Sequence, residues 1–368
     1  MSEKMPTTPT PRRVAVVGSN GIYAQYGGWD QLVNNLAERR SACIEYLIFN
    51  ARDTPRPKSL PDGVAVRRLP LKASGFEGLF FDMWSILECL WRVDTILLLG
   101  VQGIPLLVLL RWVWKPVIVS NVGGIEWERP KFGLASRLYL RLCFWLSLRY
   151  SSTVILDNQH HRRYLPAARR ARVVVIPYGG VIDTTLEADE ALTRKYPFLR
   201  GTYYLSVSRS LEDNKLEELC AAFARSRHAL VLISNLSKSE YGRSVQAKYR
   251  DCGNITLIDG LYSKPELDLI RRTCAAYVHT HTLCGTAPSL VEMVMARRPI
   301  LSIDVPQNRY TLAQSGFYFS EFDELIAMLD SGADLTAFVS PDDLARSYAW
   351  DLIVRRYEDE YRGAAGNV

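Results

Sequence analysis

The stretch RVAVVGSNGIYAQYGGWDQLVNNLAE, residues 13–38, decides the fold. It opens with an apolar run, 13–18, that ends in glycine, which is typical of a buried strand in a parallel sheet. A glycine-rich loop follows, and from Leu32 to Ala37 apolar residues recur at helical spacing, with Asp30 placing a negative charge near the helix start. The stretch therefore predicts a strand, a loop and a helix, the repeating unit of an α/β sheet.

The same alternation continues along the rest of the chain. In the first half we expect further strands at 45–50, 64–69, 95–99, 117–121, 153–157 and 173–177, and helices at 81–92, 104–114 and 135–149. In the second half we expect strands at 203–208, 229–234, 255–257, 276–279 and 299–303, and helices at 216–225, 264–273, 288–296 and 322–329. This order predicts two Rossmann-like, doubly wound parallel-sheet domains whose strand ends face an interdomain cleft.

Length and charge also indicate two domains. The 368 residues are 48% apolar and 23% charged, which excludes a disordered chain, a collagen-like repeat and a disulfide scaffold. Residues 1–180 hold 24 Lys and Arg against 13 Asp and Glu, whereas residues 181–368 hold 21 against 26. We place the domain boundary where the charge balance changes sign. The expected parts are a flexible tail at 1–12, a domain at 13–180, a second domain at 181–345 and a C-terminal helix at 346–363.

The chain lacks the signals of several other protein classes. Its seven cysteines stand singly, as reduced thiols of a cytoplasmic protein do. The chain shows no zinc spacing, and His279 and His281 have no matching acidic or cysteine partner nearby, so we expect no metal. The apolar stretch 95–114 contains glycines, a proline and Arg111, which favours a strand, a turn and a helix over a membrane span. The second strand ends in Asn50 instead of the acidic residue that holds an NAD ribose.

Two loops of the first half carry residues that suit a phosphate or a sugar. Gly27 and Gly28 would let a ligand approach a helix N-terminus, where anions bind, although a simple turn would use the same glycines. In a later loop Glu126, Trp127 and Arg129 offer a carboxylate, an aromatic platform and a cation, a mixture that suits a sugar. The alternative for this loop is a helix cap with a packed tryptophan.

Two loops of the second half are typical of a nucleoside diphosphate site. Arg209 leaves a strand and Lys215 begins a helix, so the two cations can clamp an anion unless they are ordinary surface charges around a helix cap. Further on, Pro288 marks a helix start, and backbone N–H groups from Gly285 onward would face an anion. Glu292, inside that helix, can accept hydrogen bonds from two ribose hydroxyls. A diphosphate beside a ribose is the pattern of a nucleotide-sugar.

Taken together, these loops carry a family resemblance. The strings YGGWDQLVNNLAE, NVGGIEWERPK, ILDNQHHRRYL, IPYGG, YYLSVSRSLEDN and GTAPSLVEMV resemble the GT-B glycosyltransferases of family four, over about residues 12–360. They are most similar to the rhamnosyltransferase-like branch that builds bacterial capsules and O-antigens. The resemblance implies metal-independent, retaining transfer of L-rhamnose from dTDP-β-L-rhamnose to a saccharide on a lipid carrier. It also implies that 13–180 is the acceptor side, that 181–345 binds the nucleotide-sugar, and that the helix at 346–363 crosses back onto the first domain.

The resemblance also implies roles for single residues. Glu292 would hold the ribose, and Arg209, with Asn214 or Lys215, would neutralise the departing diphosphate. The catalytic residues implied in this way are Arg209, Lys215 and Glu126. The donor-binding residues implied are Glu292, Asn214, Gly285, Thr286, Ala287, Ser289 and His281. The acceptor and phosphate loop would contain Gly27, Gly28, Trp127 and Arg129.

Two positions depart from the family pattern. Gly123 stands where the branch usually has an acidic residue, and Cys284 stands where family four often has a glutamate, eight residues before Glu292. Both positions would touch the sugar. A transferase for another UDP-, GDP- or dTDP-sugar, an epimerase-like relative and a non-catalytic relative therefore stay open as alternatives.

The helix expected at 135–149 combines Arg137, Arg141 and Arg149 with apolar and aromatic residues. A basic, aromatic-rich helix suits anionic lipid headgroups, so we expect peripheral docking on the inner face of the bacterial plasma membrane, where a lipid-linked acceptor lies. The alternative is a core helix with a solvated basic edge. The basic residues are not interleaved with a known nucleic-acid recognition motif, so we expect no nucleic-acid partner.

Overall fold

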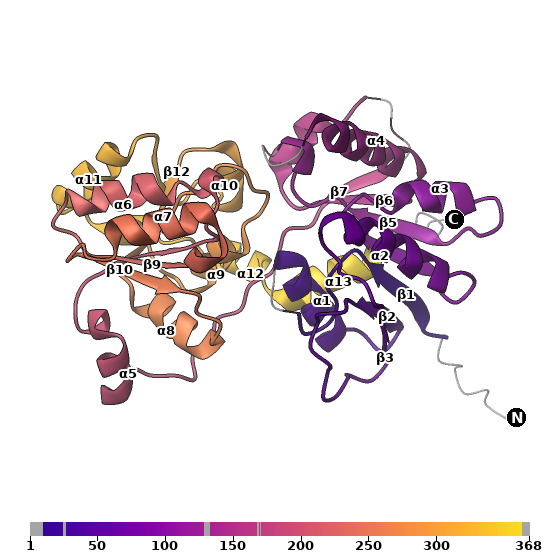
Figure 1. Cartoon of the computed structure of the whole chain (residues 1–368), viewed down its shortest axis with the longest axis horizontal. Coiled ribbons are helices and arrows are strands. Elements are labelled where there is room, and N and C mark those ends of the chain that lie inside the picture. The colour runs from indigo at the N-terminus through magenta and orange to yellow at the C-terminus, as the bar shows by residue number, and fades with distance from the viewer. Residues whose placement is uncertain (1–9, 25–26, 129–132, 168, 170, 363–368) are drawn as a thin grey trace, which may run out of the picture. The chain divides into compact units, whose positions relative to one another are not determined.

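The computed structural model describes residues 10–24, 27–128, 133–167, 169 and 171–362, and it divides into two compact units (Figure 1). Unit 1 consists of Met1–Tyr178 with Trp350–Val368, and unit 2 consists of Gly179–Ala349. Each unit is built around its own parallel sheet with helices, so the expected α/β fold class is confirmed.

The described part of unit 1 contains a seven-stranded parallel sheet in the order β3-β2-β1-β4-β5-β6-β7. The strands are β1 (Arg12–Val17), β2 (Ile44–Asn50), β3 (Val64–Arg68), β4 (Thr95–Leu99), β5 (Val117–Asn121), β6 (Thr153–Leu156) and β7 (Arg172–Val175). All of β4 and the last four residues of β1 are buried, because helices cover both faces of the sheet. The strand order reverses between β1 and β4, and ligands of such sheets bind at this reversal.

The helices of unit 1 cover its sheet from both sides. They are α1 (Gly28–Glu38), α2 (Gly75–Glu88), α3 (Ile104–Leu110), α4 (Leu134–Tyr150) and α13 (Trp350–Glu360), with 3-10 turns η1 (Glu126–Glu128) and η2 (Gln159–Tyr164). Helices α2, α3 and α4 share one apolar cluster through side chains such as Phe81, Leu107 and Phe144. On the other face α1 and α13 bury Leu36 and Ile353 in a second cluster. The apolar stretch at 95–114 forms β4 and α3, and among the described residues no helix is long and apolar enough to cross a membrane.

The C-terminal helix begins later than the sequence predicts. A short helix, α12 (Asp342–Ser347), ends first, and α13 starts only at Trp350. Between them the N–H of Gly180 donates to the carbonyl of Tyr348 at 2.8 Å, and Gly180 pairs with Ala349 as a β-bridge. The chain at Tyr348 and Ala349 therefore bonds to Gly180 instead of continuing a helix. Beyond it α13, yellow in Figure 1, lies beside α1 and receives a hydrogen bond from Asn121 at the Tyr357 hydroxyl.

Unit 2 repeats the design with a six-stranded parallel sheet in the order β10-β9-β8-β11-β12-β13. Its strands are β8 (Tyr204–Val207), β9 (Leu230–Ser234), β10 (Ile255–Asp259), β11 (Ala276–His279), β12 (Ile300–Ile303) and β13 (Phe317–Phe319). Besides α12, its helices are α5 (Glu190–Lys195), α6 (Leu216–Ala224), α7 (Glu240–Tyr249), α8 (Lys264–Thr273), α9 (Pro288–Met295), α10 (Pro306–Thr311) and α11 (Phe322–Asp330), with 3-10 turns η3 (Pro197–Arg200), η4 (Glu212–Asn214), η5 (Leu236–Lys238) and η6 (Leu335–Phe338). The order reverses between β8 and β11. The sequence analysis missed α5, α7, α10, α12 and β13.

Candidate functional site

In unit 2 the strand order brings together two loops that the sequence marks separately as anion-binding. Strands β8 and β11 are neighbours, and loops 208–215 and 280–287 leave their carboxyl ends. The backbone N–H and the hydroxyl of Thr282 both donate to the carbonyl of Asp213, at 3.1 and 2.9 Å, and the hydroxyl of Thr280 donates to the carbonyl of Asn214. The two loops therefore form one site at the switch point of the sheet.

Loop 208–215 places two cations at this site. Arg209 is exposed and Lys215 is half-buried, and neither forms an ion pair with any residue that the structure describes. The backbone of Lys215 is left-handed, with φ at +50°, a conformation that costs a non-glycine residue about 1–3 kcal/mol. Asn214 is buried, and its amide donates to the carbonyl of Arg209 at 2.7 Å. The amide thus braces the loop, while the two charges stay available for an anion.

Loop 280–287 supplies backbone donors next to these cations. Gly285, Thr286 and Ala287 are buried, and α9 begins at Pro288, directly after them. Within the described residues, the N–H groups of Gly285 and Ala287 donate to no acceptor. Unpaired N–H groups at a helix start are suited to an anion.

Glu292 lies in the second turn of α9, which begins at Pro288 as expected, and an arginine holds it in place. Arg271, on α8, donates from its Nη2 to Oε2 of Glu292 and from its Nη1 to Asp268 at 2.7 Å. The side chains of Arg271 and Asp268 are 4% and 0% exposed, and that of Glu292 is 13% exposed. Lys264 also pairs with Asp268, at 2.6 Å.

The charges of this cluster also act on Arg271. Burial opposes the positive charge of Arg271, but Glu292 and Asp268 outweigh burial, so the pKa of Arg271 is raised. Oε1 of Glu292 accepts no hydrogen bond in the described part of the chain, which leaves it for two hydroxyls of a ligand. Sequence reasoning missed Arg271; the available signal was an arginine three residues after Asp268 on an amphipathic helix.

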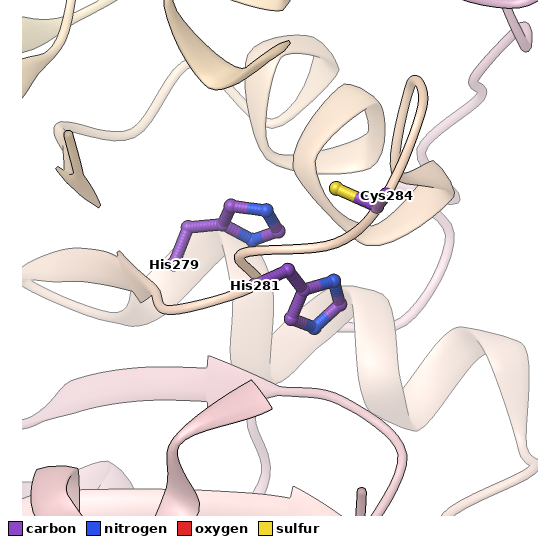
Figure 2. Close-up of side chains that lie close together, drawn as sticks. All are labelled: His279, His281 and Cys284. Atoms are coloured by element: carbon purple, nitrogen blue, oxygen red, sulfur yellow. The ribbon is translucent and has the colours of Figure 1, made fainter. Parts of the chain in front are cut away.

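Three potential metal ligands lie together at the end of β11 and in loop 280–287, although the sequence predicts no metal site. Figure 2 shows His279 at the end of β11, His281 two residues on, and Cys284 where the loop folds back toward them. The imidazole rings are 4.3 Å apart between centroids, and one ligand atom from each of the three residues lies within 4.8 Å of the others. The expectation that the histidines have no cysteine partner is therefore wrong. The spacing His-x-His-x-x-Cys matches no common zinc pattern, so only the fold reveals the cluster.

In unit 1 the loop after β1 is held by close packing at the strand ends. A Cβ on Gly18 would stand 2.0 Å from the carbonyl oxygen of Leu99, and the φ of Gly18 is +97°. The backbone and side-chain amides of Asn20 donate to the buried carboxylate of Asp30, so Asp30 also anchors the loop. Gly27 is the extended N-cap of α1, and Gly28 is its first residue, as the sequence predicts.

Trp29 explains the glycine at position 123. A Cβ on Gly123 would meet the Trp29 ring at 2.8 Å, and one on Gly100 would meet it at 3.2 Å. The φ of Gly123 is +59°, which also disfavours a side chain. Trp29 therefore fills the space that a side chain at position 123 would need, and its buried Nε1–H donates to no acceptor in the described residues.

Around η1 the structure favours packing over sugar binding for Trp127. Its ring contacts Phe144 and Tyr164, with centroids 4.9 and 6.0 Å away, and Arg137 donates to its carbonyl at 2.7 Å. This is the packed tryptophan of the alternative interpretation. Glu126 is half-buried in the same turn, and Arg129 lies outside the described residues.

The other expected donor-binding residues, Ser289 and His281, are half-buried in unit 2 at the same loop and helix start. The hydroxyl of Tyr277, on β11, reaches the carbonyl of Val207 at the end of β8, 3.0 Å away. This contact braces the two strand ends from which both loops leave. The catalytic and donor-binding residues expected in unit 2 therefore all lie on these two loops and on α9.

No protein-family model matches the sequence, and a search of curated proteins finds no relative. Solved structures do share the fold. Sucrose-phosphate synthase from Thermosynechococcus elongatus matches with a TM-score of 0.77 at 15% identity, over 96% of this chain and 98% of the other. Trehalose-6-phosphate synthase OtsA gives 0.74 at 13%, over 96% and 99%. Anabaena HepE, in complex with UDP-glucose, gives 0.72 at 14%, over 95% and 98%. The fold is thus that of the GT-B glycosyltransferases.

Proposed function

We propose that this protein is a glycosyltransferase that uses a nucleotide diphosphate sugar. The observation that carries the proposal is a pair of cations, Arg209 and Lys215, that form no ion pair with any described residue. The N–H groups of Gly285 and Ala287, which have no acceptor among those residues, and the fixed carboxylate of Glu292 complete the arrangement. These three elements meet at the switch point of unit 2, where sheets of this kind bind nucleotides. A GT-B fold supports the same conclusion.

Each element would act on a different part of the donor. Glu292 would accept hydrogen bonds from the ribose hydroxyls at Oε1, while Arg271 holds Oε2. Arg209 and Lys215 would neutralise the negative charge that grows on the diphosphate as the bond to the sugar breaks. The N–H groups of Gly285 and Ala287 would add donors to the same oxygens, and the fixed site would align the acceptor hydroxyl for attack on the same face of the sugar.

The similar solved structures and the sequence resemblance favour different nucleotides for the donor. HepE binds UDP-glucose, and a similar structure from Burkholderia vietnamiensis is a UDP-forming trehalose-phosphate synthase, which favours a UDP-sugar. The sequence resemblance favours dTDP-β-L-rhamnose and retention of configuration. The resemblance would put an acidic residue beside the sugar at position 123, where this chain has Gly123 packed against Trp29, so the donor sugar itself can differ from that of the branch.

A thermal-shift panel of UDP-, dTDP- and GDP-sugars decides between these donors. A ligand at one hundred times its Kd stabilises the protein by about 2.7 kcal/mol. We expect one nucleotide series to stabilise the wild-type chain, and Glu292→Ala and Arg209→Ala each to abolish most transfer without unfolding the protein. Stabilisation by none of the donors would contradict the proposal.

We also propose that unit 1 docks on an anionic membrane surface, where a lipid-linked acceptor would lie. The outer sides of α2, α3 and α4, with the short segments that follow α2 and α3, form what we call the aromatic surface. Its exposed members are Phe76, Phe80, Trp84, Leu87, Trp91, Leu109, Trp112, Val113, Leu134, Leu138, Leu142 and Trp145. Trp112 is 89% exposed. The three helices are neighbours whose inner sides fill one core cluster, so their outer sides adjoin.

Basic residues accompany this aromatic surface. Arg111, Lys115 and Arg141 are exposed and form no ion pair within the described residues. Tryptophan side chains settle at lipid headgroups, and each nearby cation adds about 1 kcal/mol of attraction to an anionic surface. α4 is therefore both a core helix, through its buried side, and a candidate for lipid contact through its exposed side.

Flotation with vesicles tests this docking. We expect the chain to float with phosphatidylglycerol vesicles at low salt, and less with phosphatidylcholine vesicles or at high salt. Trp112→Ser with Trp145→Ser should abolish flotation, whereas Tyr262→Ser, an exposed aromatic residue of unit 2, should not change it. No flotation with anionic vesicles at low salt would refute docking and leave the nucleotide-sugar proposal untouched.

A further inference from the structure

The cluster of His279, His281 and Cys284 has the composition of a metal site. We propose that these three side chains bind a divalent cation that prefers nitrogen and sulfur ligands, for which Zn²⁺ is the best match. Figure 2 shows the Cys284 sulfur directed toward the His279 ring, with the His281 ring beside it. The ligand atoms lie within 4.8 Å of one another.

The buried side chain of His279 is the strongest indication that this cluster binds a ligand. The residue is 0% exposed, and neither ring nitrogen has a hydrogen-bond partner among the described residues. Buried polar side-chain atoms nearly always have a partner, and two unpaired nitrogens on one ring are costly. A metal ion bound by a ring nitrogen would give this buried side chain the partner that the described residues do not supply.

The geometry needs only a small adjustment. Zinc binds histidine nitrogen at about 2.0–2.1 Å and cysteine sulfur at about 2.3 Å, so two nitrogens and one sulfur of a tetrahedral site lie roughly 3.3–3.6 Å apart. The ligand atoms here lie within 4.8 Å of one another, at most about 1.5 Å beyond that spacing, and rotation of the Cys284 and His281 side chains would bring them closer. Asn308 donates to the carbonyl of His281 at 3.2 Å and so holds the loop close to this geometry.

Three protein ligands leave one tetrahedral position open for water or another ligand. Two imidazoles with one thiolate favour Zn²⁺ over Mg²⁺ or Ca²⁺, which prefer oxygen ligands. Metal binding at this cluster does not depend on the proposed transfer, because all three ligands are side chains of this chain and none comes from a nucleotide-sugar.

Cobalt is a direct probe, because Co²⁺ occupies zinc sites and a cobalt–thiolate bond absorbs in the near ultraviolet. The full-length chain, freed of metal with EDTA, would be titrated with Co²⁺ and then with Zn²⁺. We expect one Co²⁺ per chain, a thiolate-to-cobalt band, visible absorption typical of tetrahedral cobalt, and loss of both when Zn²⁺ is added.

Variants identify the ligands. Cys284→Ser should remove the thiolate band and weaken Zn²⁺ binding at least about a hundredfold, since even partners of metal ligands contribute 10–100-fold. Cys252→Ser, another half-buried thiol of unit 2, should leave both unchanged. His281→Asn serves as a second variant, with circular dichroism as a check of folding, and should weaken binding equally. Absence of the thiolate band in the wild-type chain, or its persistence in Cys284→Ser, would overturn the proposal.

Discussion

Replacing Arg271 by methionine tests the charge cluster that fixes Glu292. The change removes a buried cation and leaves two carboxylates, Asp268 and Glu292, without their shared partner. Removing one member of a buried ion pair costs about 3–5 kcal/mol, because the remaining charge is left uncompensated. We expect the lower end, about 3 kcal/mol, because Lys264 still pairs with Asp268 and because Glu292 is partly open to water.

The loss of stability in unit 2 can be measured separately from the stability of unit 1. All eight tryptophans lie in unit 1, whereas Arg271 lies in unit 2, so tryptophan fluorescence reports on unit 1 and far-ultraviolet circular dichroism on both units. In urea, Arg271→Met should lower the midpoint of the dichroism transition and leave an independent fluorescence transition of unit 1 in place.

A matched control and a double variant complete this test. Arg250→Met removes an exposed arginine of unit 2 and should change stability by less than about 0.5 kcal/mol. Adding Glu292→Gln to Arg271→Met should restore part of the lost free energy of unfolding, because the double variant no longer contains the uncompensated carboxylate of Glu292. A loss below about 1 kcal/mol in Arg271→Met would refute the view that this arginine holds Glu292.

Two further predictions concern unit 1, and urea unfolding followed by tryptophan fluorescence checks both. Burial raises the pKa of Asp82 to about 8, so between its ordinary value near 4 and pH 8 the native state keeps a proton that the unfolded chain releases. The free energy of unfolding should therefore fall by up to about 1.4 kcal/mol per pH unit as the pH rises through this window. In Asp82→Asn this dependence on pH should disappear, and parallel pH profiles for the variant and the wild-type chain would contradict the prediction. Gly18→Ala should cost more than about 2 kcal/mol, because its Cβ would meet the carbonyl of Leu99 in a left-handed backbone. Gly133→Ala, in the same unit and with open space around it, should cost less than about 1 kcal/mol, and equal effects of the two changes would contradict the packing.

Elements with a strong apolar pattern could be predicted from the sequence, and weakly patterned ones could not. Strands such as β4 are apolar at every position because both faces of the sheet are covered, so their runs stand out. Helix α7 has only a few apolar residues, Tyr241, Val245 and Tyr249, and Gly242 near its start lowers its helix propensity. β13 spans three residues, too few for any period.

For the site, sequence reasoning could find the loops but not their partners. Arg209 and Lys215 stand at a strand end and a helix start, and both positions follow from local pattern. The contact of Arg271 with Glu292, and that of Cys284 with His279, join residues whose proximity is set by packing and by the path of a loop. Such contacts leave no periodic signal in the sequence.

The most direct test of the proposed function is calorimetric binding of UDP and dTDP, each compared with its nucleoside, to the full-length chain. If unit 2 holds a nucleoside diphosphate, at least one diphosphate binds much more tightly than its nucleoside. Charge-assisted contacts contribute about 1.5–3 kcal/mol each, so Arg209→Met should weaken that binding about 10–150-fold, while Arg200→Met, an exposed arginine elsewhere in unit 2, should not. Equal affinity for nucleoside and diphosphate, or unchanged affinity in Arg209→Met, would contradict the nucleotide-sugar site.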